Sequence, residues 1–304
     1  MLCDAHVHFF SPRFFATLAG QRQVATVDAL RHLGWDDPVS VETLADRWVA
    51  ELDAHAVARA AIIASVPGDD DSIAEAVARH PTRFVGYFML DPTAEDAENR
   101  VMAALERGVR GVCLFPAMQR YSLHDERVAR VAAVLSAFVP AAGTARPVLF
   151  VHCGVLSVGA RARLGLPSHF DVSKGNPLHL HKLALSHPAL PIVIPHFGAG
   201  LFREALMLAD LCPNVCFDTS SSNGWMKYSP ELTLERVFET ALTVVGAERL
   251  LFGTDSSFFP RGWHRAIHER QRAALEAIGA TEAQQAAIFG GNFSRVFGDP
   301  HASS

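Results

Sequence analysis

The chain has 304 residues, 49% of them hydrophobic, and its 27 Lys and Arg against 32 Asp and Glu give a formal net charge of −5. This mild charge, without a run of cationic residues, excludes a typical nucleic-acid or membrane-surface protein. No secretory signal pattern and no apolar run of about 18 residues occurs, so we expect a cytoplasmic protein with no membrane contact.

Apolar runs alternate with amphipathic segments along the chain. The first strand is expected at about 1–8, and an elaborated loop with some helix at about 9–40. Seven further strands are expected at about 60–65, 83–90, 109–115, 147–152, 191–196, 215–219 and 249–255. Helices are expected between these strands at about 41–55, 72–80, 94–107, 125–138, 177–186, 201–211 and 230–245, and after the last strand at about 262–279 and 281–298. Asp71 or Ser72 is the expected cap of the helix at about 72–80.

Eight strands in alternation with helices predict an α/β fold, a closed (β/α)8 TIM barrel that forms a single domain over residues 1–304. No Gly-x-Gly-x-x-Gly follows the first strand, which disfavours a dinucleotide-binding fold. The cysteines are odd in number and lie mostly in apolar runs, so we expect reduced core side chains at Cys3, Cys113, Cys153, Cys212 and Cys216.

The first strand carries two histidines, His6 and His8, separated by one residue. Strand side chains alternate between faces, so both imidazoles project from the same face within reach of one ion. Neutral imidazole is the commonest metal ligand. A surface strand with two solvated histidines is the alternative. Asp4 shares their face and either supports the two histidines or caps a turn at the barrel floor.

Three later strands also end in residues that can bind a metal: His152, His196 and Asp255. Each has a structural explanation by itself, as a core histidine, a turn cap or a helix N-cap. In a (β/α)8 barrel, however, the C-terminal ends of the strands meet at one rim. Burial of these three side chains and the first two histidines without partners would be costly. We therefore expect a metal centre at this rim.

Five motifs stand at or near the strand ends and at the end of the chain. They are Asp4-x-His6-x-His8, Val151-His152-Cys153-Gly154, Pro195-His196-Phe197-Gly198, Phe252-Gly253-Thr254-Asp255 and the closing Gly291-Asn292-Phe293-Ser294-Arg295-Val296-Phe297-Gly298. Together they resemble the amidohydrolase superfamily, and more narrowly its amidohydrolase-2 branch, which includes relatives of aminocarboxymuconate-semialdehyde decarboxylase. The resemblance covers essentially the whole chain and implies a TIM barrel of the metal-dependent hydrolase type.

The resemblance implies a role for each strand-end residue. One divalent ion, zinc in the first place with manganese as the alternative, would be bound by His6, His8, His152 and Asp255. His196 would orient or deprotonate the water on the metal, or act as a weaker ligand. On chemical grounds, an Asp255 carboxylate in contact with both metal and water could shuttle a proton. Binuclear members carry a bridging lysine after the fourth strand. That strand ends here in Leu114-Phe115-Pro116, so a mononuclear centre is expected.

The loops must supply the contacts to a substrate. Their candidates, each of which can equally be a solvated loop residue, are Phe9, Arg13, Met118, Arg120, Tyr121, Arg161, Arg163, His169, Asp171, Lys174, Trp225, Lys227 and Tyr228. Arginines near a metal suit a carboxylate, because the guanidinium fork binds it bidentately.

We therefore expect a metal-dependent hydrolase that acts on a small carboxylated or cyclic ester or amide. Two alternatives stay open, a non-oxidative decarboxylase (carboxy-lyase) acting on an aromatic or enoate carboxylic acid, and a non-catalytic barrel that retains metal and binds a ligand. The expected partner is a small-molecule substrate, without nucleic acid or membrane. A homodimer is what the resemblance suggests.

Overall fold

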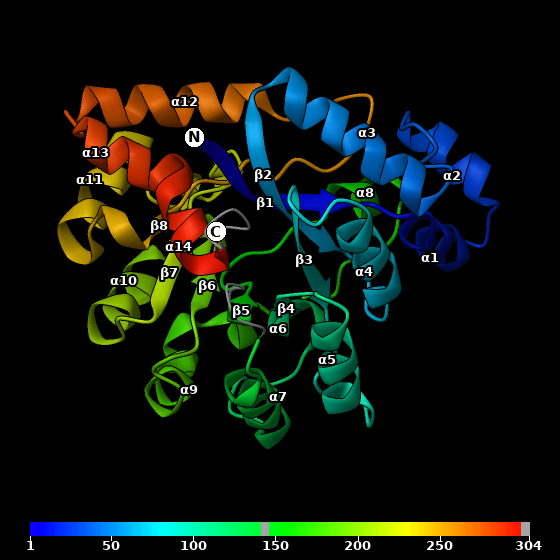
Figure 1. The fold of residues 1–304 in the computed structure, drawn as a ribbon, viewed down its shortest axis with the longest axis horizontal. Helices are drawn as coiled ribbons and strands as arrows, with labels where there is room; N and C mark the ends of the chain where they lie inside the picture. Colours follow the sequence, from blue (N-terminus) through cyan, green and yellow to red (C-terminus); the bar gives the residue numbers. More distant parts are fainter. Residues whose placement is uncertain (141–145, 299–304) are drawn as a thin grey trace.

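A computed structural model describes residues 1–140 and 146–298 of the chain. Eight parallel strands form one sheet in the order β1 to β8, and Figure 1 shows them in the centre with helices around them. The strands are β1 (Leu2–Phe9), β2 (Val57–Ala64), β3 (Phe84–Met89), β4 (Gly111–Leu114), β5 (Val148–Val151), β6 (Ile192–Ile194), β7 (Val215–Asp218) and β8 (Leu250–Leu251).

Backbone hydrogen bonds between β1 and the segment that runs on from β8 close the barrel. The amide of Ala5 donates to the Phe252 carbonyl at 2.8 Å, and the amide of His8 donates to Ser256 at 2.7 Å. The amide of Asp255 donates to the His6 carbonyl at 2.9 Å. The predicted (β/α)8 TIM barrel is therefore confirmed.

The helices follow the strands around the barrel. Three of them, α1 (Pro12–Arg22), α2 (Thr26–Leu33) and α3 (Val41–Ala54), lie between β1 and β2. The others are α4 (Asp70–Arg79), α5 (Ala97–Glu106), α6 (Pro116–Gln119), α7 (Glu126–Ala137), α8 (Gly159–Arg163), α9 (His181–Ser186), α10 (Phe202–Leu211), α11 (Leu234–Val245), α12 (Arg265–Ala277), α13 (Glu282–Ala286) and α14 (Asn292–Phe297). Short turns complete the chain at η1 (Val172–Gly175), η2 (Pro177–Leu180), η3 (Pro195–Gly198), η4 (Gly224–Tyr228), η5 (Ala247–Arg249) and η6 (Ala287–Gly291).

Side chains of each strand alternate between the barrel interior and the helical layer, as a period of two requires. On β2, Ile62 packs in the cluster between sheet and helices, whereas Ile63 packs inside the barrel with Tyr87 and Phe150. The last helix, α14, adds Phe293 to this interior cluster. This helix contacts β1 and β8, and the ring of its last residue lies 5.8 Å from Tyr87. The interior below the strand ends is therefore filled, which leaves the opposite rim for a site.

The structure corrects three details of the sequence-based expectations. The segment 9–40 is mostly helical, because α1 and α2 occupy most of it. The cap of α4 is Asp69 and not Asp71 or Ser72; the Ser72 hydroxyl donates to the Asp69 carboxylate at 2.6 Å. The sixth and eighth strands end at Ile194 and Leu251, earlier than expected, so the last metal-binding candidates lie in the turns that follow.

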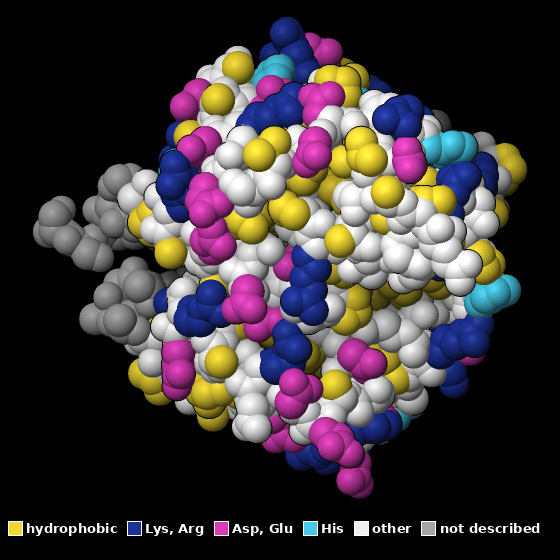
Figure 2. Space-filling model, turned by 90° about the vertical axis from the view of Figure 1, so that its right-hand side faces the viewer, with side chains coloured by type: hydrophobic (Ala, Val, Ile, Leu, Met, Phe, Trp, Pro, Cys, Tyr) yellow, Lys and Arg dark blue, Asp and Glu magenta, His cyan; other side chains and the backbone are white. Residues whose placement is uncertain are grey.

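Other expectations concern the whole chain. All five cysteines are buried and free of disulfides. The single-domain bounds 1–304 stay a prediction, and their segments 141–145 and 299–304 lie outside the described residues. Within the described ranges, no helix has the length and apolar character needed to cross a bilayer. The face in Figure 2 carries cationic and anionic side chains interspersed with one another.

Candidate metal centre

Three potential ligand atoms converge at the rim where β1 meets the segment after β8. The Nε2 atoms of His6 and His8 lie 3.4 Å apart. Asp255 Oδ1 lies 3.6 Å from the first of these atoms and 3.1 Å from the second. Ligands at about 2.0–2.1 Å from a tetrahedral zinc ion are about 3.3 Å from one another. The three residues therefore fit three corners of a tetrahedral divalent-ion site, and they form the one group of this kind within the described residues.

The orientation of His6 is set by a carboxylate at the end of β7. Asp218 Oδ2 lies 2.5 Å from the His6 Nδ1 atom, and both side chains are buried. A carboxylate in this position accepts the Nδ1 proton, which leaves the Nε2 lone pair for an ion. Burial opposes ionisation of the imidazole, yet the negative charge of Asp218 outweighs it and raises the pKa of His6 to about 9.

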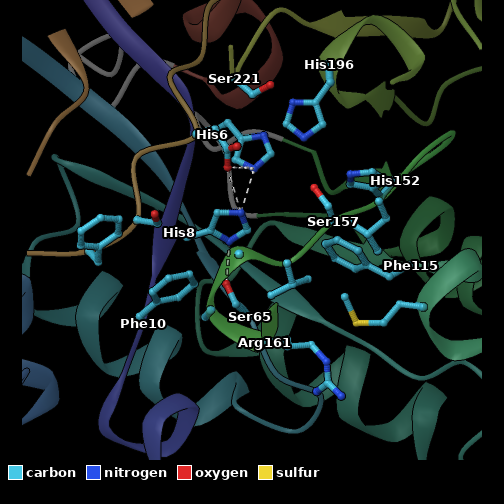
Figure 3. A pocket seen from close by; sticks show the side chains of 18 of the residues that line it. His6, His8, Phe10, Ser65, Phe115, His152, Ser157, Arg161, His196 and Ser221 are labelled. Carbon is cyan, nitrogen blue, oxygen red and sulfur yellow. Dashed lines mark hydrogen bonds and ion pairs between the residues drawn. The ribbon is translucent and has the colours of Figure 1, made fainter. Parts of the chain in front are cut away.

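The orientation of His8 is set by a hydroxyl after β2. Ser65 Oγ donates to the Ile63 carbonyl at 3.1 Å and lies 2.6 Å from His8 Nδ1. The hydroxyl has only one proton. When that proton is donated to the Ile63 carbonyl, the hydroxyl oxygen can act only as an acceptor, so Nδ1 of His8 must be the donor. His8 Nε2 is then unprotonated, and Figure 3 shows this edge of the ring directed toward His6. Burial lowers the pKa of His8, which favours the neutral form that binds metal.

Asp255 reaches the histidines through an unusual backbone conformation. Its φ of 60° lies in the left-handed region, which residues other than glycine rarely adopt. Its amide hydrogen bond to the His6 carbonyl holds it there. Burial alone would raise the pKa of the carboxyl group, but the adjacent His8 imidazole and the positive charge of His6 bring it below its usual range. The side chain is therefore an anion at neutral pH.

His196 lies beside this group, with its ring centroid 5.0 Å from that of His6. It occupies η3, where its own φ of 55° and that of Phe197 of 52° are both left-handed. Its Nδ1 lies 3.2 Å from the Ser220 carbonyl oxygen, a pure acceptor, and 2.9 Å from the hydroxyl of the same residue. Nδ1 therefore carries the proton and Nε2 is a free base. Burial lowers the pKa of His196, so it is neutral near pH 7.

His152 lines the same cavity but lies outside the compact group of three. Its ring is stacked on Phe115 at 5.5 Å and stands 5.2 Å from that of His196; Figure 3 shows it set apart from His8. Its buried Nδ1 has no hydrogen-bond partner in the described part of the chain. Burial holds the pKa of His152 well below its ordinary value. The loop after β5 runs directly against η3, because a Cβ on Gly154 would come within 2.2 Å of the Gly198 carbonyl oxygen.

Asp4 lies behind the metal-binding group. It is fully buried, and its two oxygens accept hydrogen bonds from the amides of His6 and Thr254, the Thr254 hydroxyl and the Trp263 indole, at 2.5–3.1 Å. Burial raises the pKa of Asp4 to about 6, although these donors favour its ionised form. Of the two roles considered for Asp4, its contacts fit support of the histidines, because it fastens β1 to the residue that precedes Asp255.

The site opens into a cavity of about 680 Å³. Its lining includes the cationic residues Arg161, Arg163, Lys227 and Arg261. Asp255 is the single carboxylate among the described residues of the wall. With a divalent ion bound, the cavity would carry a strong excess of positive charge, which favours an anionic ligand.

Some of the loop residues predicted to contact a substrate line the cavity, and others lie outside its lining. Those that line the cavity are Met118, Arg161, Arg163, Trp225, Lys227 and Tyr228. Those outside its lining are Phe9, Arg13, Arg120, Tyr121, His169, Asp171 and Lys174. Three residues were missed by sequence reasoning, Ser65, Asp218 and Arg261. The first two had a usable signal, because Ser65 directly follows β2 and Asp218 ends β7, at the same rim as the predicted ligands.

Comparisons with known proteins agree with this architecture. A family model described as "Amidohydrolase" matches residues 3–298. Protein fluG of Emericella nidulans is 32% identical over 108 residues, which are 36% of this chain but 12% of that protein, so the chain matches only a small part of this relative.

Solved structures share the fold at low sequence identity. An amidohydrolase from Burkholderia multivorans with bound zinc has a TM-score of 0.66 and 19% identity, covering 99% of this chain and 100% of that chain. A putative 2-pyrone-4,6-dicarboxylic acid hydrolase from Pseudomonas putida has a TM-score of 0.61 and 19% identity, covering 98% of both chains. These similarities show the shared barrel.

Proposed function

Because the family model covers nearly its whole length, the chain belongs to the amidohydrolase family, and we propose that it is a mononuclear metal-dependent hydrolase of a carboxylated or cyclic ester or amide. One observation carries this proposal, the convergence of His6, His8 and Asp255 at the spacing of a tetrahedral ion. Zinc is the proposed metal and manganese the alternative, since His and Asp ligands accept both.

We assign His152 to the fourth ligand position in this proposal. Its imidazole is neutral, as a metal ligand must be. Within the described residues no hydrogen bond to Nδ1 holds the ring in its present place. Both features are compatible with a ring that turns toward an ion.

Bound divalent metal supplies Lewis acidity, which lowers the pKa of water and polarises a carbonyl group. The residues of this chain supply the proton transfers. His196 is the proposed general base, because its Nδ1 proton is held by the Ser220 carbonyl and its Nε2 is free. Water adds to the carbonyl carbon, Nε2 takes its proton, and the protonated imidazole returns that proton to the leaving oxygen or nitrogen. The negative charge of Asp255 favours the protonated form of His196 and so stabilises the imidazolium in between.

The cavity supports an anionic substrate. Four cationic side chains line the cavity together with a single carboxylate, that of Asp255, which would bind the ion. None of these four cations has an ion-pair partner within the described residues. A substrate carboxylate would provide a partner for one of them.

Turnover of substrate panels tests the proposal. Zinc-loaded protein is assayed on lactones and amides, and in parallel on hydroxybenzoates with detection of released CO₂. We expect ring opening or amide cleavage without CO₂. Loss of this turnover in His196→Ala at unchanged zinc content, with His169→Ala as an exposed control, would support the assigned base. Release of CO₂ would favour the carboxy-lyase alternative, and binding without turnover would favour a ligand-binding barrel.

A further inference from the structure

We propose that Arg261, in the loop after β8, is the residue that binds the substrate's carboxylate next to the metal and so selects substrates with an anionic group a few bonds from the scissile carbonyl. This inference rests on the proposed hydrolase function. It assigns a specificity role to a residue that no sequence motif singled out.

One edge of the Arg261 guanidinium is fixed by its own loop. Nη2 donates to Ser257 Oγ at 2.9 Å and to the backbone carbonyl of Asp255 at 3.3 Å. Its two other nitrogens, Nη1 and Nε, make no hydrogen bond to any described residue. The side chain is exposed and lines the cavity. It therefore keeps donors free for a ligand, in the fork arrangement that matches a carboxylate.

The guanidinium also rests on a stack of aromatic rings. Its Cζ lies 4.5 Å from the Phe258 ring centroid. Phe258 is stacked on Trp35 at 4.2 Å and 10°. Trp35 lies 5.7 Å and 17° from Phe10, which in turn is stacked on Phe14 at 3.9 Å. The segment between β1 and α3 thus supports the loop after β8 from across the rim. Such support keeps a binding group preorganised, so that less entropy is lost on binding.

The negative charge of Asp255 acts on Arg261, but the two side chains form no ion pair. Arg261 forms no ion pair with a described carboxylate, and the carboxylate nearest along its loop, Asp255, directs Oδ1 to the two histidines. Because Arg261 contacts the backbone of Asp255 itself, an anion held there would lie beside the residue that holds the ion. The carboxylate and the scissile carbonyl must therefore be close in the substrate.

The other two arginines of the wall are engaged elsewhere. Arg161 donates to Gln21 Oε1 at 2.5 Å and to the Pro167 carbonyl at 2.7 Å, and Figure 3 shows its guanidinium turned away from His8. Arg163 donates to the Leu33 carbonyl. Both are tied to the segment around α1 and α2 or to their own loop. Arg261 is the arginine whose support comes from the metal-binding loop itself.

Binding of simple dicarboxylates tests the proposal without requiring turnover. Zinc-loaded protein is titrated by calorimetry with the dicarboxylates from malonate to adipate, each beside its own monoamide. Either member of a pair can place one carboxylate on the ion, but only the diacid offers a second one. We expect at least one diacid to bind about ten- to hundred-fold more tightly than its monoamide. We expect Arg261→Met to abolish this preference and Arg261→Lys to retain part of it.

Arg161→Met and Arg265→Met are the controls; the latter residue is exposed on α12 and pairs with Glu269. Both should keep the diacid preference. Zinc content and melting temperature are measured for every variant, and Arg261→Lys decides the case if the methionine variant does not fold. The proposal is overturned if folded Arg261→Met or Arg261→Lys keeps the full diacid preference of the wild type, if the preference disappears instead in Arg161→Met, or if the wild type shows none. Diacid preference without hydrolysis of any lactone or amide would instead contradict the hydrolase function alone.

Discussion

Asp218 Oδ2 lies 2.5 Å from His6 Nδ1, although the two residues are 212 positions apart in the chain. The contact joins β7 to β1 across the barrel interior, where both side chains are shielded from water. It fixes which nitrogen of His6 faces the metal site. The pKa of Asp218 is correspondingly low despite its burial, because the positive charge of His6 favours the carboxylate.

Replacement of Asp218 by asparagine should weaken metal binding. An amide cannot accept the Nδ1 proton as strongly as a carboxylate, so the ring orientation and the basicity of Nε2 are both reduced. We expect the zinc dissociation constant at pH 9 to rise about 10- to 100-fold, measured by chelator competition. Asp210→Asn, on an exposed position of α10, should leave it unchanged. Equal zinc affinity in the two variants would contradict the assigned role of Asp218.

Metal binding should release a proton from His6. With its pKa raised to about 9 by Asp218, the metal-free protein holds this proton at neutral pH, and an ion needs the same nitrogen. The affinity should therefore rise about tenfold per pH unit from about pH 6.5 to 8.5 and level off above pH 9. Calorimetry in buffers of different ionisation enthalpy counts the protons. Zinc binding without proton release in this range would contradict the ion pair.

Removal of the Ser65 hydroxyl should loosen His8. In Ser65→Ala the buried Nδ1 proton loses its 2.6 Å acceptor, and the ring can turn away from His6. We expect zinc affinity to fall about tenfold, with little change in the unfolding midpoint. Ser173→Ala, at an exposed position, is the matched control and should bind zinc like the wild type.

His152→Ala tests the proposed fourth ligand. If the ring turns toward the ion on binding, its removal should lower zinc affinity at least about tenfold, while the fold is retained, because the Nδ1 atom makes no hydrogen bond that would be lost in the described structure. Competition with a chelator measures the affinity, and melting temperature checks the fold. Wild-type affinity in this variant would instead leave His152 as part of the cavity wall.

Asp4→Asn should destabilise the closure of the barrel. Each oxygen of Asp4 accepts two hydrogen bonds. An asparagine amide in either orientation therefore places its NH₂ group against N–H or O–H donors. The expected loss is about 1–3 kcal/mol of unfolding free energy, measured by urea denaturation. Asp96→Asn on the surface should cost much less, and comparable losses in both variants would refute the argument.

The sequence by itself determined the barrel and much of its rim. Apolar runs of strand length recur eight times with helices between them, and parallel strands buried on both faces leave exactly that pattern. The period of two placed His6 and His8 on one face, and the rule that strand ends meet at one rim brought His152, His196 and Asp255 into the same cavity.

Tertiary structure alone decided which of these atoms meet. Periodicity records neighbours along one strand, whereas the distance between strand ends depends on the stagger of the barrel and on the turns that follow each strand. Asp255 reaches the histidines through a left-handed φ, while His152, predicted by the same rule, lies outside their group. The partners Asp218 and Ser65 depend on this register too, and the cationic site at Arg261 depends on a ring stack between segments more than 200 residues apart.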